Sequence, residues 1–341
     1  MKKSVFSLVL LVVLALSAVV ILPIAAQDDV FSVAVVAPSA TNDLAFSQSM
    51  FDALTIIDEE MGDAFEFVFQ EGTFIVDDAA VALREWAASG EYDLVIAHGS
   101  QYGSVVEELA AEFPEVSFAW GTDVNTFGLD NVFAYTAAAD QGGFINGVLA
   151  AALSESGNIG VVGPIEVGDA KLYVDGFVFG AANMNPDAVV NVTYIQSFSD
   201  VPLATEAANA FIANGADVLT GSAQMVVGPI AVALENEVSW FGTQSSQAEL
   251  AAASGITFQV YRFDVILRDM ITKIQEGTLG GEAYTLTLEN GGLEIQLGAG
   301  IPEEAVADIE SAIETLIAGI VSGEVPTLPV EDPMATPEAG S

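Results

Sequence analysis

Residues 93–100 read DLVIAHGS, and residues 217–223 read DVLTGSA. Each stretch begins with an aspartate, continues as a short run of mostly apolar residues, and ends in glycine and small polar residues. Short runs of this kind, bounded by turn residues, are typical of strands that are buried on both faces of a parallel sheet. Because helical patterns separate successive runs, the sequence predicts βαβ units.

The same order of elements occurs twice around these stretches. In the first half, strands are expected at residues 31–36, 65–70, 93–97 and 116–120. In the second half, they are expected at residues 158–162, 189–196, 217–220 and 238–241. The first and third strands are about 60 residues apart in both halves. The sequence therefore predicts an α/β fold of two doubly wound parallel-sheet lobes, joined near residues 135–147 and separated by a cleft that can close over a solute.

The chain after residue 259 contains further elements that we expect the two lobes to share. A helix is predicted near residues 264–276 and another over residues 303–323. Between them, residues 284–297 are interpreted as a β-hairpin that turns at Asn290-Gly291-Gly292. Residues 326–341 are rich in Pro, Thr and Glu, and we predict that they are disordered.

The N-terminus has the layout of an export signal. Lys2 and Lys3 precede an uncharged apolar run over residues 5–24, and two small residues, Ala25 and Ala26, follow it. Residues 1–26 are therefore predicted to be a secretory signal peptide. An apolar run of about 20 residues is also long enough to span a bilayer, so an uncleaved anchor is the alternative. Either way, we expect the rest of the chain to lie outside the cytoplasmic membrane, released or held by this segment.

Composition excludes several kinds of function. The chain has 48 acidic and 7 basic residues, a formal net charge of −41, so we expect no nucleic-acid partner. It has no cysteine and one histidine, which excludes disulfides, thiol catalysis and zinc motifs with two histidines. No phosphate-binding loop of the G-x-x-x-x-G-K-[ST] type occurs. We therefore expect a protein that is not an enzyme and that needs neither cofactor nor metal.

Six short segments carry a resemblance to a known family. In chain order they are NDLAFSQS at 42–49, DQGGFING at 140–147, KLYVDGF at 171–177, GADV at 215–218, YRFD at 261–264 and NGG at 290–292. Their order and spacing are similar, over residues 33–326, to the basic membrane protein family of ABC-transporter solute-binding proteins, which includes purine-nucleoside receptors. The resemblance implies the type I periplasmic-binding-protein fold, a nucleoside-like small molecule as ligand, an ABC permease as partner, and a monomer.

That fold implies lobe boundaries, since its chain crosses between the lobes three times. Crossings near residues 136, 260 and 290 assign residues 28–135 and 260–289 to an N-terminal lobe. They assign residues 136–259 and 290–325 to a C-terminal lobe. Two other functions remain open on the same fold: a membrane-tethered sensor of a small ligand, and binding of a solute other than a nucleoside, such as a sugar.

The resemblance also implies ligand-binding residues near the start of the first helix in each half. Phe46 and Tyr173 hold equivalent places there, and rings from opposite lobes can sandwich a flat ligand. The alternative for Tyr173 is a helix residue packed on the sheet. Asp43 lies in the loop before Phe46, where a carboxylate accepts hydrogen bonds from a ligand or caps the helix. Ser47 and Gln48 are further polar candidates.

Other candidates lie where strands end. His98 and Gly99 follow the third strand of the first half, and Gly221 follows the corresponding strand of the second. Because ligands bind at the carboxyl ends of parallel strands, we expect these residues to face the cleft. For His98, the alternative is a loop residue bonded to the backbone.

Two departures from the family pattern bear on the ligand. Gln244 stands where the resemblance places an aspartate for ribose hydroxyls, and Tyr261 stands where the family commonly has lysine. A hydrogen bond to a charged group contributes about 1.5–3 kcal/mol, against about 1 kcal/mol for a neutral one. Either Gln244 and Tyr261 hold a ribose through weaker contacts, or the solute is not a ribonucleoside. Since one acid and one base are lost together, we expect a neutral ligand.

Overall fold

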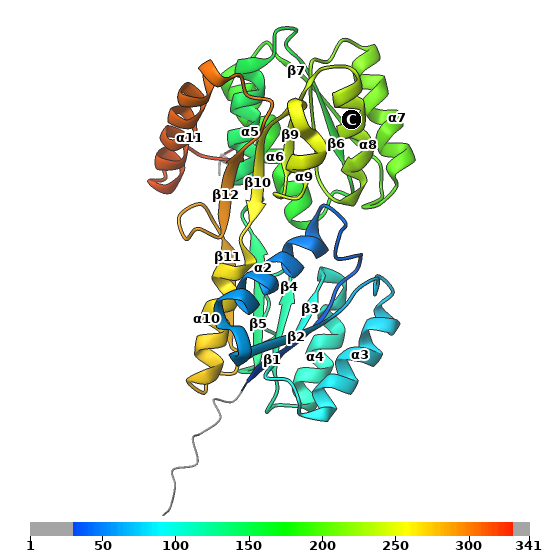
Figure 1. The fold of residues 1–341 in the computed structure, drawn as a ribbon, viewed down its shortest axis with the longest axis vertical. Coiled ribbons are helices and arrows are strands. Elements are labelled where there is room, and N and C mark those ends of the chain that lie inside the picture. Colours follow the sequence, from blue (N-terminus) through cyan, green and yellow to red (C-terminus); the bar gives the residue numbers. More distant parts are fainter. Residues whose placement is uncertain (1–29, 330–341) are drawn as a thin grey trace, which may run out of the picture. The chain divides into compact units, whose positions relative to one another are not determined.

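The structure is a computed structural model that describes residues 30–329, and its strands form two six-stranded sheets (Figure 1). The predicted signal peptide and most of the predicted disordered tail lie outside the described residues. The first sheet has the order β11-β5-β4-β3-β1-β2, and every neighbouring pair in it is parallel. Its strands are β1 (Phe31–Val36), β2 (Phe65–Gln70), β3 (Leu94–His98), β4 (Ser117–Gly121), β5 (Val132–Ala137) and β11 (Glu282–Leu286).

The second sheet repeats this arrangement with the order β12-β10-β9-β8-β6-β7. Only β12, at its edge, runs antiparallel to its neighbour β10. Its strands are β6 (Asn158–Gly163), β7 (Val189–Tyr194), β8 (Val218–Gly221), β9 (Ser239–Thr243), β10 (Gly255–Tyr261) and β12 (Leu293–Leu297). The prediction of two doubly wound, mostly parallel sheets is confirmed.

The burial of residues along each strand explains the pattern of apolar residues from which the strands were predicted. The central strand β1, FSVAVV, is buried at every position, because helices cover both faces of the sheet. The edge strand β2, FEFVFQ, alternates between more and less buried residues, since one of its faces is open to solvent. Successive residues of β1 point to opposite faces, so Val33 and Val35 join one core cluster and Val36 joins another.

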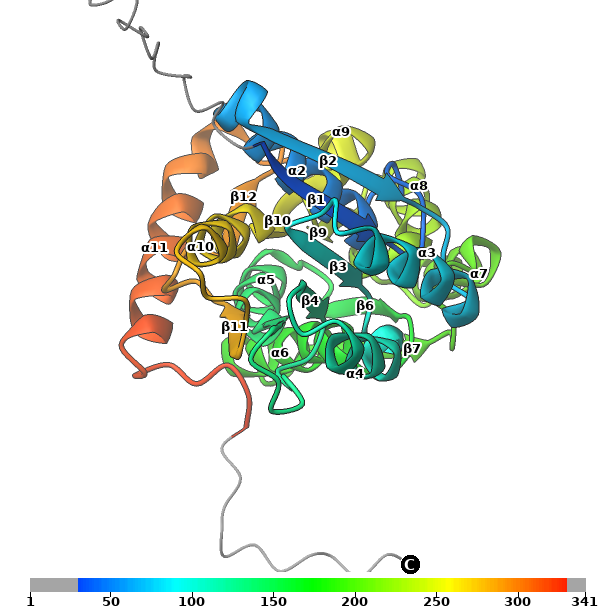
Figure 2. The same cartoon turned by 90° about the horizontal axis from the view of Figure 1, so that it is seen from below.

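Helices cover both faces of each sheet, as Figures 1 and 2 show. In the first sheet, α2 (Phe46–Met61) and α10 (Phe263–Gln275) share the core of Val33 and Val35, whereas α3 (Val76–Ser89) and α4 (Gly103–Glu112) share that of Val36. The second sheet has on one face α5 (Ala139–Leu153), α6 (Gly168–Met184) and α11 (Val306–Val321). On the other face it has α7 (Val201–Ala213), α8 (Val227–Glu235) and α9 (Gln247–Ala251). We call each sheet with its helices a lobe.

The chain passes between the sheets several times. It leaves the first sheet after β5, enters α5 of the second lobe, and returns from β10 to α10 and β11. It then crosses again to β12, which pairs with β10. Of the described residues, those from Phe31 to Pro329 cluster as one compact unit. Among residues 30–329, no helix is long and apolar enough to cross a membrane.

The predicted hairpin at residues 284–297 is wrong. β11 pairs in parallel with β5 of the first sheet, and β12 pairs with β10 of the second, so the two strands have different partners. The turn itself is ordered as expected, because Asn290 Oδ1 accepts the backbone N–H groups of Thr287 and Gly292, both at 2.9 Å. Local sequence specifies such a turn, but edge positions in two separate sheets decide where its strands pair.

Candidate functional site

A cavity of about 230 Å³ lies between the two lobes. Its wall is formed by loops that follow the carboxyl ends of strands in both sheets, where parallel α/β folds bind ligands. The first lobe contributes Pro38, Ser39, Ala45, Phe46, Phe74, Gly99, Ser100, Gln101 and Thr122. The second sheet and its loops contribute Val167, Gly168, Asp169, Ala170, Tyr173, Phe198, Ser199, Ser222, Ala223, Gln224, Thr243, Gln244 and Tyr261.

Phe46 is the first residue of α2, and its ring is fixed by other aromatic side chains. It stacks on the imidazole of His98 with the ring centroids 3.7 Å apart and the planes within 8°. The ring of Phe263 meets both of them edge-on. Phe46 therefore lines the cavity as a rigid apolar surface.

His98 lies behind this cavity wall and is completely buried. Its Nε2 is 2.9 Å from the backbone oxygen of Phe46, and its Nδ1 is 2.8 Å from the Tyr135 hydroxyl. Because a carbonyl oxygen only accepts, Nε2 carries the hydrogen and Nδ1 accepts from Tyr135. Burial lowers the pKa of His98 to about 3. The side chain is therefore a neutral support for Phe46, and contact between His98 and a ligand stays a prediction.

We expect the His98 imidazole not to titrate between pH 5 and 8. Its folded pKa lies below the unfolded value of about 6.5, so the folded state binds fewer protons than the unfolded one. Stability is then fully present above about pH 6.5 and is progressively lost as the pH falls toward 3. Since the chain has one histidine, the imidazole signals in an NMR pH titration are unambiguous. A titration midpoint near 6.5 would contradict the buried neutral state.

The side chain of Asp43 closes the N-terminus of α2. Its carboxylate accepts from the backbone N–H groups of Ala45, Ser47 and Gln48 at 2.8, 3.2 and 3.1 Å, and from the Ser39 hydroxyl at 2.5 Å. This is the capping alternative left open by the sequence.

Two residues near Asp43 also form hydrogen bonds that stabilise the loop before α2. Ser47 Oγ accepts from the Ser39 backbone N–H at 3.2 Å, and Gln48 Oε1 accepts from Leu44 N–H at 3.0 Å. Asp43, Ser47 and Gln48 lie behind the lining residues, so their part in binding a ligand stays a prediction.

Tyr173 lies in α6 and lines the cavity, although it is 1% exposed. Its hydroxyl is 2.8 Å from Thr220 Oγ1, which itself donates to the carbonyl oxygen of Phe241 at 2.7 Å. The hydroxyl therefore donates to Thr220 and accepts from Asn146 Nδ2 at 3.0 Å. Burial raises the pKa of Tyr173 to about 12. Because its hydroxyl is already hydrogen-bonded, Tyr173 lines the cavity with part of its aromatic ring.

The two glycine candidates differ in position. Gly99 lies on the cavity wall directly after β3. Gly221 lies at the end of β8 and is absent from the lining residues. A Cβ at Gly221 would be 2.8 Å from the backbone oxygen of Val162, so this glycine permits close strand packing.

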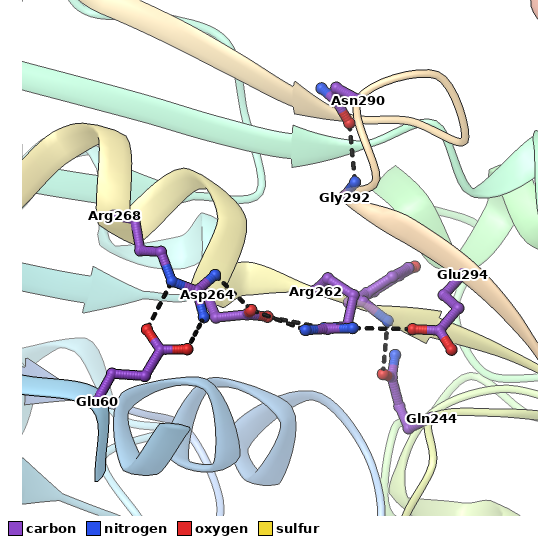
Figure 3. Close-up of polar contacts among 9 residues, drawn as sticks. Glu60, Gln244, Arg262, Asp264, Arg268, Asn290, Gly292 and Glu294 are labelled. Atoms are coloured by element: carbon purple, nitrogen blue, oxygen red, sulfur yellow. Dashed lines mark hydrogen bonds and ion pairs between the residues drawn. The ribbon is translucent and has the colours of Figure 1, made fainter. Parts of the chain in front are cut away.

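Gln244 and Tyr261, the two departures from the family pattern, lie together on the wall. Gln244 Oε1 accepts the backbone N–H of Tyr261 at 3.1 Å (Figure 3), and its own backbone N–H donates to the carbonyl oxygen of Gln259 at 2.6 Å. Gln244 has a positive φ of 69°, so this loop conformation is unusual for a residue with a side chain. Burial and the nearby carboxylate of Asp169 raise the pKa of Tyr261 well above its ordinary value.

Three polar atoms of the lining residues are buried without a hydrogen-bond partner. They are the Ser222 hydroxyl, the Gln101 amide nitrogen and the Gln224 amide oxygen. Ser222 is 6% exposed, so water in the bulk does not replace the missing partner. A buried polar group without a partner is costly, about 1–3 kcal/mol, and such groups in a cavity wall are suited to bind a polar ligand.

The sequence interpretation missed several residues of the wall. It did not select Phe74, Asp169, Phe198, Ser222 or Gln224, all of which follow carboxyl ends of strands. The available signal was positional: every loop after a predicted strand in both halves faces the same end of a sheet. The candidates came from segments that resemble the family and from the ends of the third strand of each half, and these five residues were not selected in either way.

The lobes also touch directly beside the cavity. Gln224 Nε2 of the second lobe donates to Ser39 Oγ at 2.9 Å and lies 3.3 Å from Asp43 Oδ2 of the first. Gln247 Nε2, from α9, donates to the backbone oxygen of Leu44 at 3.1 Å. These hydrogen bonds hold the loop before α2 against the second lobe.

An ion cluster marks the crossing from β10 to α10 (Figure 3). Arg262 pairs with Asp264 and with Glu294 of β12, each at 2.9 Å. Arg268 pairs with Asp264 and with Glu60 of α2, each at 2.7 Å. The shared carboxylate of Asp264 is 1% exposed. Figure 3 shows it between the two guanidinium groups, which connect β12 to α2 across the crossing.

Within residues 30–329, no group of three or more His, Cys, Asp or Glu side chains is placed to hold a metal ion. The cavity wall offers aromatic rings, hydroxyl and amide groups, and the carboxylate of Asp169.

Comparison with known proteins agrees with this architecture. The family model of the PnrA-like ABC transporter substrate-binding proteins matches residues 30–323. A purine-binding protein of Brucella abortus is 27% identical over 78% of this chain and 74% of its own length. A putative ABC transporter glucose-binding protein of Haloferax volcanii is 23% identical over 74% of this chain and 63% of its own length.

A solved structure has the same fold. The solute-binding protein of an ABC transporter system from Conexibacter woesei superposes with a TM-score of 0.74 at 25% identity, covering 88% of this chain and 98% of its own. The family predicted from the six segments is thus confirmed. Substrate-binding proteins of ABC importers work outside the cytoplasmic membrane, with a small molecule as ligand and a permease as partner. This chain belongs to the family of PnrA-like ABC transporter substrate-binding proteins.

Proposed function

We propose that this protein captures a neutral, flat, hydrogen-bonding solute of the nucleoside class between its lobes and delivers it unchanged to an ABC permease. The observation that carries the proposal is the cavity wall, which combines aromatic rings with polar atoms that have no partner. Phe46, Phe74 and Phe198 bring apolar ring surface to it from both lobes. Rings suit a planar base through stacking, which contributes about 0.5–1.5 kcal/mol beyond burial.

Site residues fall into two groups in this proposal. Phe46, Gly99, Tyr173, Gln244 and Tyr261 contact the solute. Asp43, Ser47, Gln48, His98 and Gly221 act from behind the wall, because their polar groups or backbones already hold the loops that carry it. With one histidine, which does not line the cavity, and no cysteine in the chain, the described wall has no Ser–His or Cys–His pair, which supports binding without chemistry.

The arrangement of the lobes completes the proposal. Residues 28–135 with 260–289, and 136–259 with 290–325, move as two bodies about the three crossings of the chain. We expect a monomer, released after Ala26 or anchored by its N-terminal segment. The placement of β5 and β11 in one sheet, and of β10 and β12 in the other, supports these boundaries.

A sugar is the second candidate solute. It is favoured by the Haloferax volcanii relative, whose name describes glucose binding. Aromatic rings and hydroxyl or amide groups also suit a sugar, which has an apolar face and many hydroxyls. Replacement of an aromatic side chain of the wall by an aliphatic one distinguishes the two candidates. Binding of a nucleobase depends on stacking against the ring, whereas binding of a sugar is less affected by its loss.

A thermal-shift panel of nucleosides, free bases and sugars tests the proposal. A ligand present at about 100 times its dissociation constant adds about 2.7 kcal/mol to the free energy of unfolding. We expect a nucleoside to produce this shift in the wild type and Phe46→Leu to remove most of it. A shift with sugars and none with any nucleoside or base would overturn the nucleoside class.

Phe51→Leu is the matched control for Phe46→Leu. Phe51 lies on the same helix, but its ring packs edge-on against Phe67 and Phe69 and does not line the cavity. Both substitutions remove a ring from α2 and should lower the ligand-free melting temperature by comparable amounts. If Phe51→Leu also removed the ligand shift, the effect of Phe46→Leu would be structural, and the stacking role would be refuted.

A further inference from the structure

The cavity wall carries one formal charge among the described lining residues, that of Asp169. All other side chains of the wall are apolar, hydroxyl or amide groups, apart from the phenols of Tyr173 and Tyr261. Asp169 is the second residue of α6 and lies on the wall beside Gly168 and Ala170. No sequence pattern distinguishes Asp169 from the other acidic residues, of which the chain has 48 in all.

No cation of residues 30–329 is available to compensate this carboxylate. Lys171 is the nearest in sequence, but its ammonium group pairs with Asp175 at 2.6 Å. Arg262 and Arg268 pair with Asp264, Arg84 pairs with Glu108 and Glu112, and Lys273 pairs with Asp269 and Glu282. The negative charge of Asp169 therefore acts on whatever enters the cavity.

The groups that donate hydrogen bonds to the Asp169 carboxylate are neutral. They are the Tyr261 hydroxyl at the end of β10, the Thr122 hydroxyl after β4, and the backbone N–H groups of Asp169 and Ala170 in α6. They do not neutralise the charge, and burial raises the pKa of Asp169 above its ordinary value. A residue that destabilises its own folded state in this way, in a binding cavity, is typical of selection for function.

A second observation points to a polar ligand in the cavity that Asp169 lines. The Ser222 hydroxyl, on the same wall, is 6% exposed and has no hydrogen-bond partner. The unpartnered Gln224 oxygen belongs to the same loop after β8. A solute that satisfies these groups lies in the same cavity as Asp169 and interacts with its charge.

We propose that Asp169 is a specificity-determining residue that excludes anionic solutes, so that the site takes the neutral or cationic, unphosphorylated member of a solute class. The mechanism is repulsion: a phosphate brought into this cavity meets an uncompensated carboxylate and no cation. The inference deepens the proposed function by stating the charge of the ligand. The inference applies to a nucleoside and to a sugar alike, because it depends on the charge of Asp169 and not on the aromatic rings of the wall.

The test compares two matched pairs of probes by isothermal titration calorimetry: adenosine with adenosine 5′-monophosphate, and glucose with glucose 6-phosphate. For each pair, the ratio of the two affinities is measured in the wild type, in Asp169→Asn and in Glu166→Gln. We expect the wild type to bind only the neutral member of one pair. In Asp169→Asn the preference for the neutral member, measured as its affinity divided by that of the phosphorylated member, should fall by about tenfold or more. This is the change expected when one charge repulsion is removed.

Glu166→Gln is the matched control. Glu166 is exposed, lies three residues before Asp169 in the loop that precedes α6, and does not line the cavity. Its substitution changes the net charge by the same amount. We expect it to leave the affinity ratio unchanged. An equal effect of both substitutions would show that the general negative charge of the protein excludes anions, and would overturn the role of Asp169. So would an unchanged ratio in Asp169→Asn, or equal wild-type affinity for both members of a pair.

Failure of the proposed function gives a different result. If the glucose pair binds and the adenosine pair does not, the nucleoside class is wrong, and the ratio for glucose still tests Asp169. If none of the four probes binds, the role of Asp169 is tested by the midpoint of urea unfolding of the ligand-free protein at pH 7. We expect Asp169→Asn to raise this midpoint, because it removes an uncompensated charge whose pKa is raised. A lowered midpoint would identify Asp169 as a structural residue and overturn the inference.

Discussion

We expect Gly147→Ala to lower the free energy of unfolding by about 3 kcal/mol, at the upper end of the usual cost of overpacking. A Cβ built at Gly147 in α5 would lie 2.0 Å from the backbone oxygen of Phe177 in α6. Because the obstructing atom belongs to a helix backbone, no side-chain rotation relieves the clash. The two helices must separate, and Phe177, which is completely buried between them and the sheet, must move as well.

The reason extends over the whole interface of α5 and α6. Gly143 and Gly147 in α5 are four residues apart, and so are Gly176 and Gly180 in α6, so that each pair lies on one helix face. At all four positions an added Cβ would lie 2.0 to 2.3 Å from a backbone oxygen of the other helix. Alanine favours an isolated helix over glycine by about 1 kcal/mol, but this preference is outweighed by the clash.

Urea unfolding followed by circular dichroism measures this prediction, with Gly319→Ala as the control. Gly319 is also inside a helix, α11, but its added Cβ would meet the side chain of Val325 and no backbone atom. We expect a change below about 1 kcal/mol there. A similar loss in both variants, or a gain in Gly147→Ala, would show that α5 and α6 are not in backbone contact.

The second large effect is expected for Asp264→Asn, which should lower the free energy of unfolding by about 2–3 kcal/mol. The Asp264 carboxylate is 1% exposed and is shared by Arg262 and Arg268 (Figure 3). Removing one partner of a buried ion pair typically costs about 3–5 kcal/mol, because a charge is left uncompensated. The cost here is lower, because both arginines are about one-third exposed and keep Glu294 and Glu60.

This loss should depend on pH in a defined direction. Burial acts to raise the pKa of Asp264, but the hydrogen bonds from Arg262 and Arg268 lower it below its ordinary value. An acid with a lowered pKa stabilises the folded state above its unfolded value of about 3.9 and loses this effect as the pH falls through the folded pKa. The difference between wild type and Asp264→Asn should therefore be constant from pH 5 to 8 and shrink below about pH 4.

Glu108→Gln is the control for Asp264→Asn. Glu108 forms an ion pair with Arg84 in which both side chains are largely exposed, 70% and 44%. Such pairs contribute about 0–1 kcal/mol. Urea midpoints at several pH values compare the two variants. If Asp264→Asn cost no more than Glu108→Gln, the ion cluster at the crossing would not stabilise the fold.

The contacts of the loop side chains could not be predicted from the sequence. Asp43 has the same sequence signature as a ligand-binding carboxylate and as a helix cap, and only its contacts with three backbone N–H groups distinguish them. His98 was correctly placed at the end of a strand and was expected to face the cleft, whereas its side chain lies under the ring of Phe46 and does not line the cavity. Its burial under Phe46 depends on residues 37 to 52 positions away in the chain. Asp169 and Ser222 lack any motif, and they share the cavity wall because the segments after β6 and β8 meet at the same end of the second sheet.

The sequence by itself determined the two sheets, their order of elements and the family, because buried parallel strands and amphipathic helices leave local patterns of apolar residues. It also determined the strongly negative charge and the lack of cysteine chemistry. Tertiary structure alone decided that β11 and β12 join different sheets, that His98 supports Phe46, and that Asp169 is the one charge of the described cavity wall. These depend on contacts between residues far apart in the chain, which no local pattern encodes.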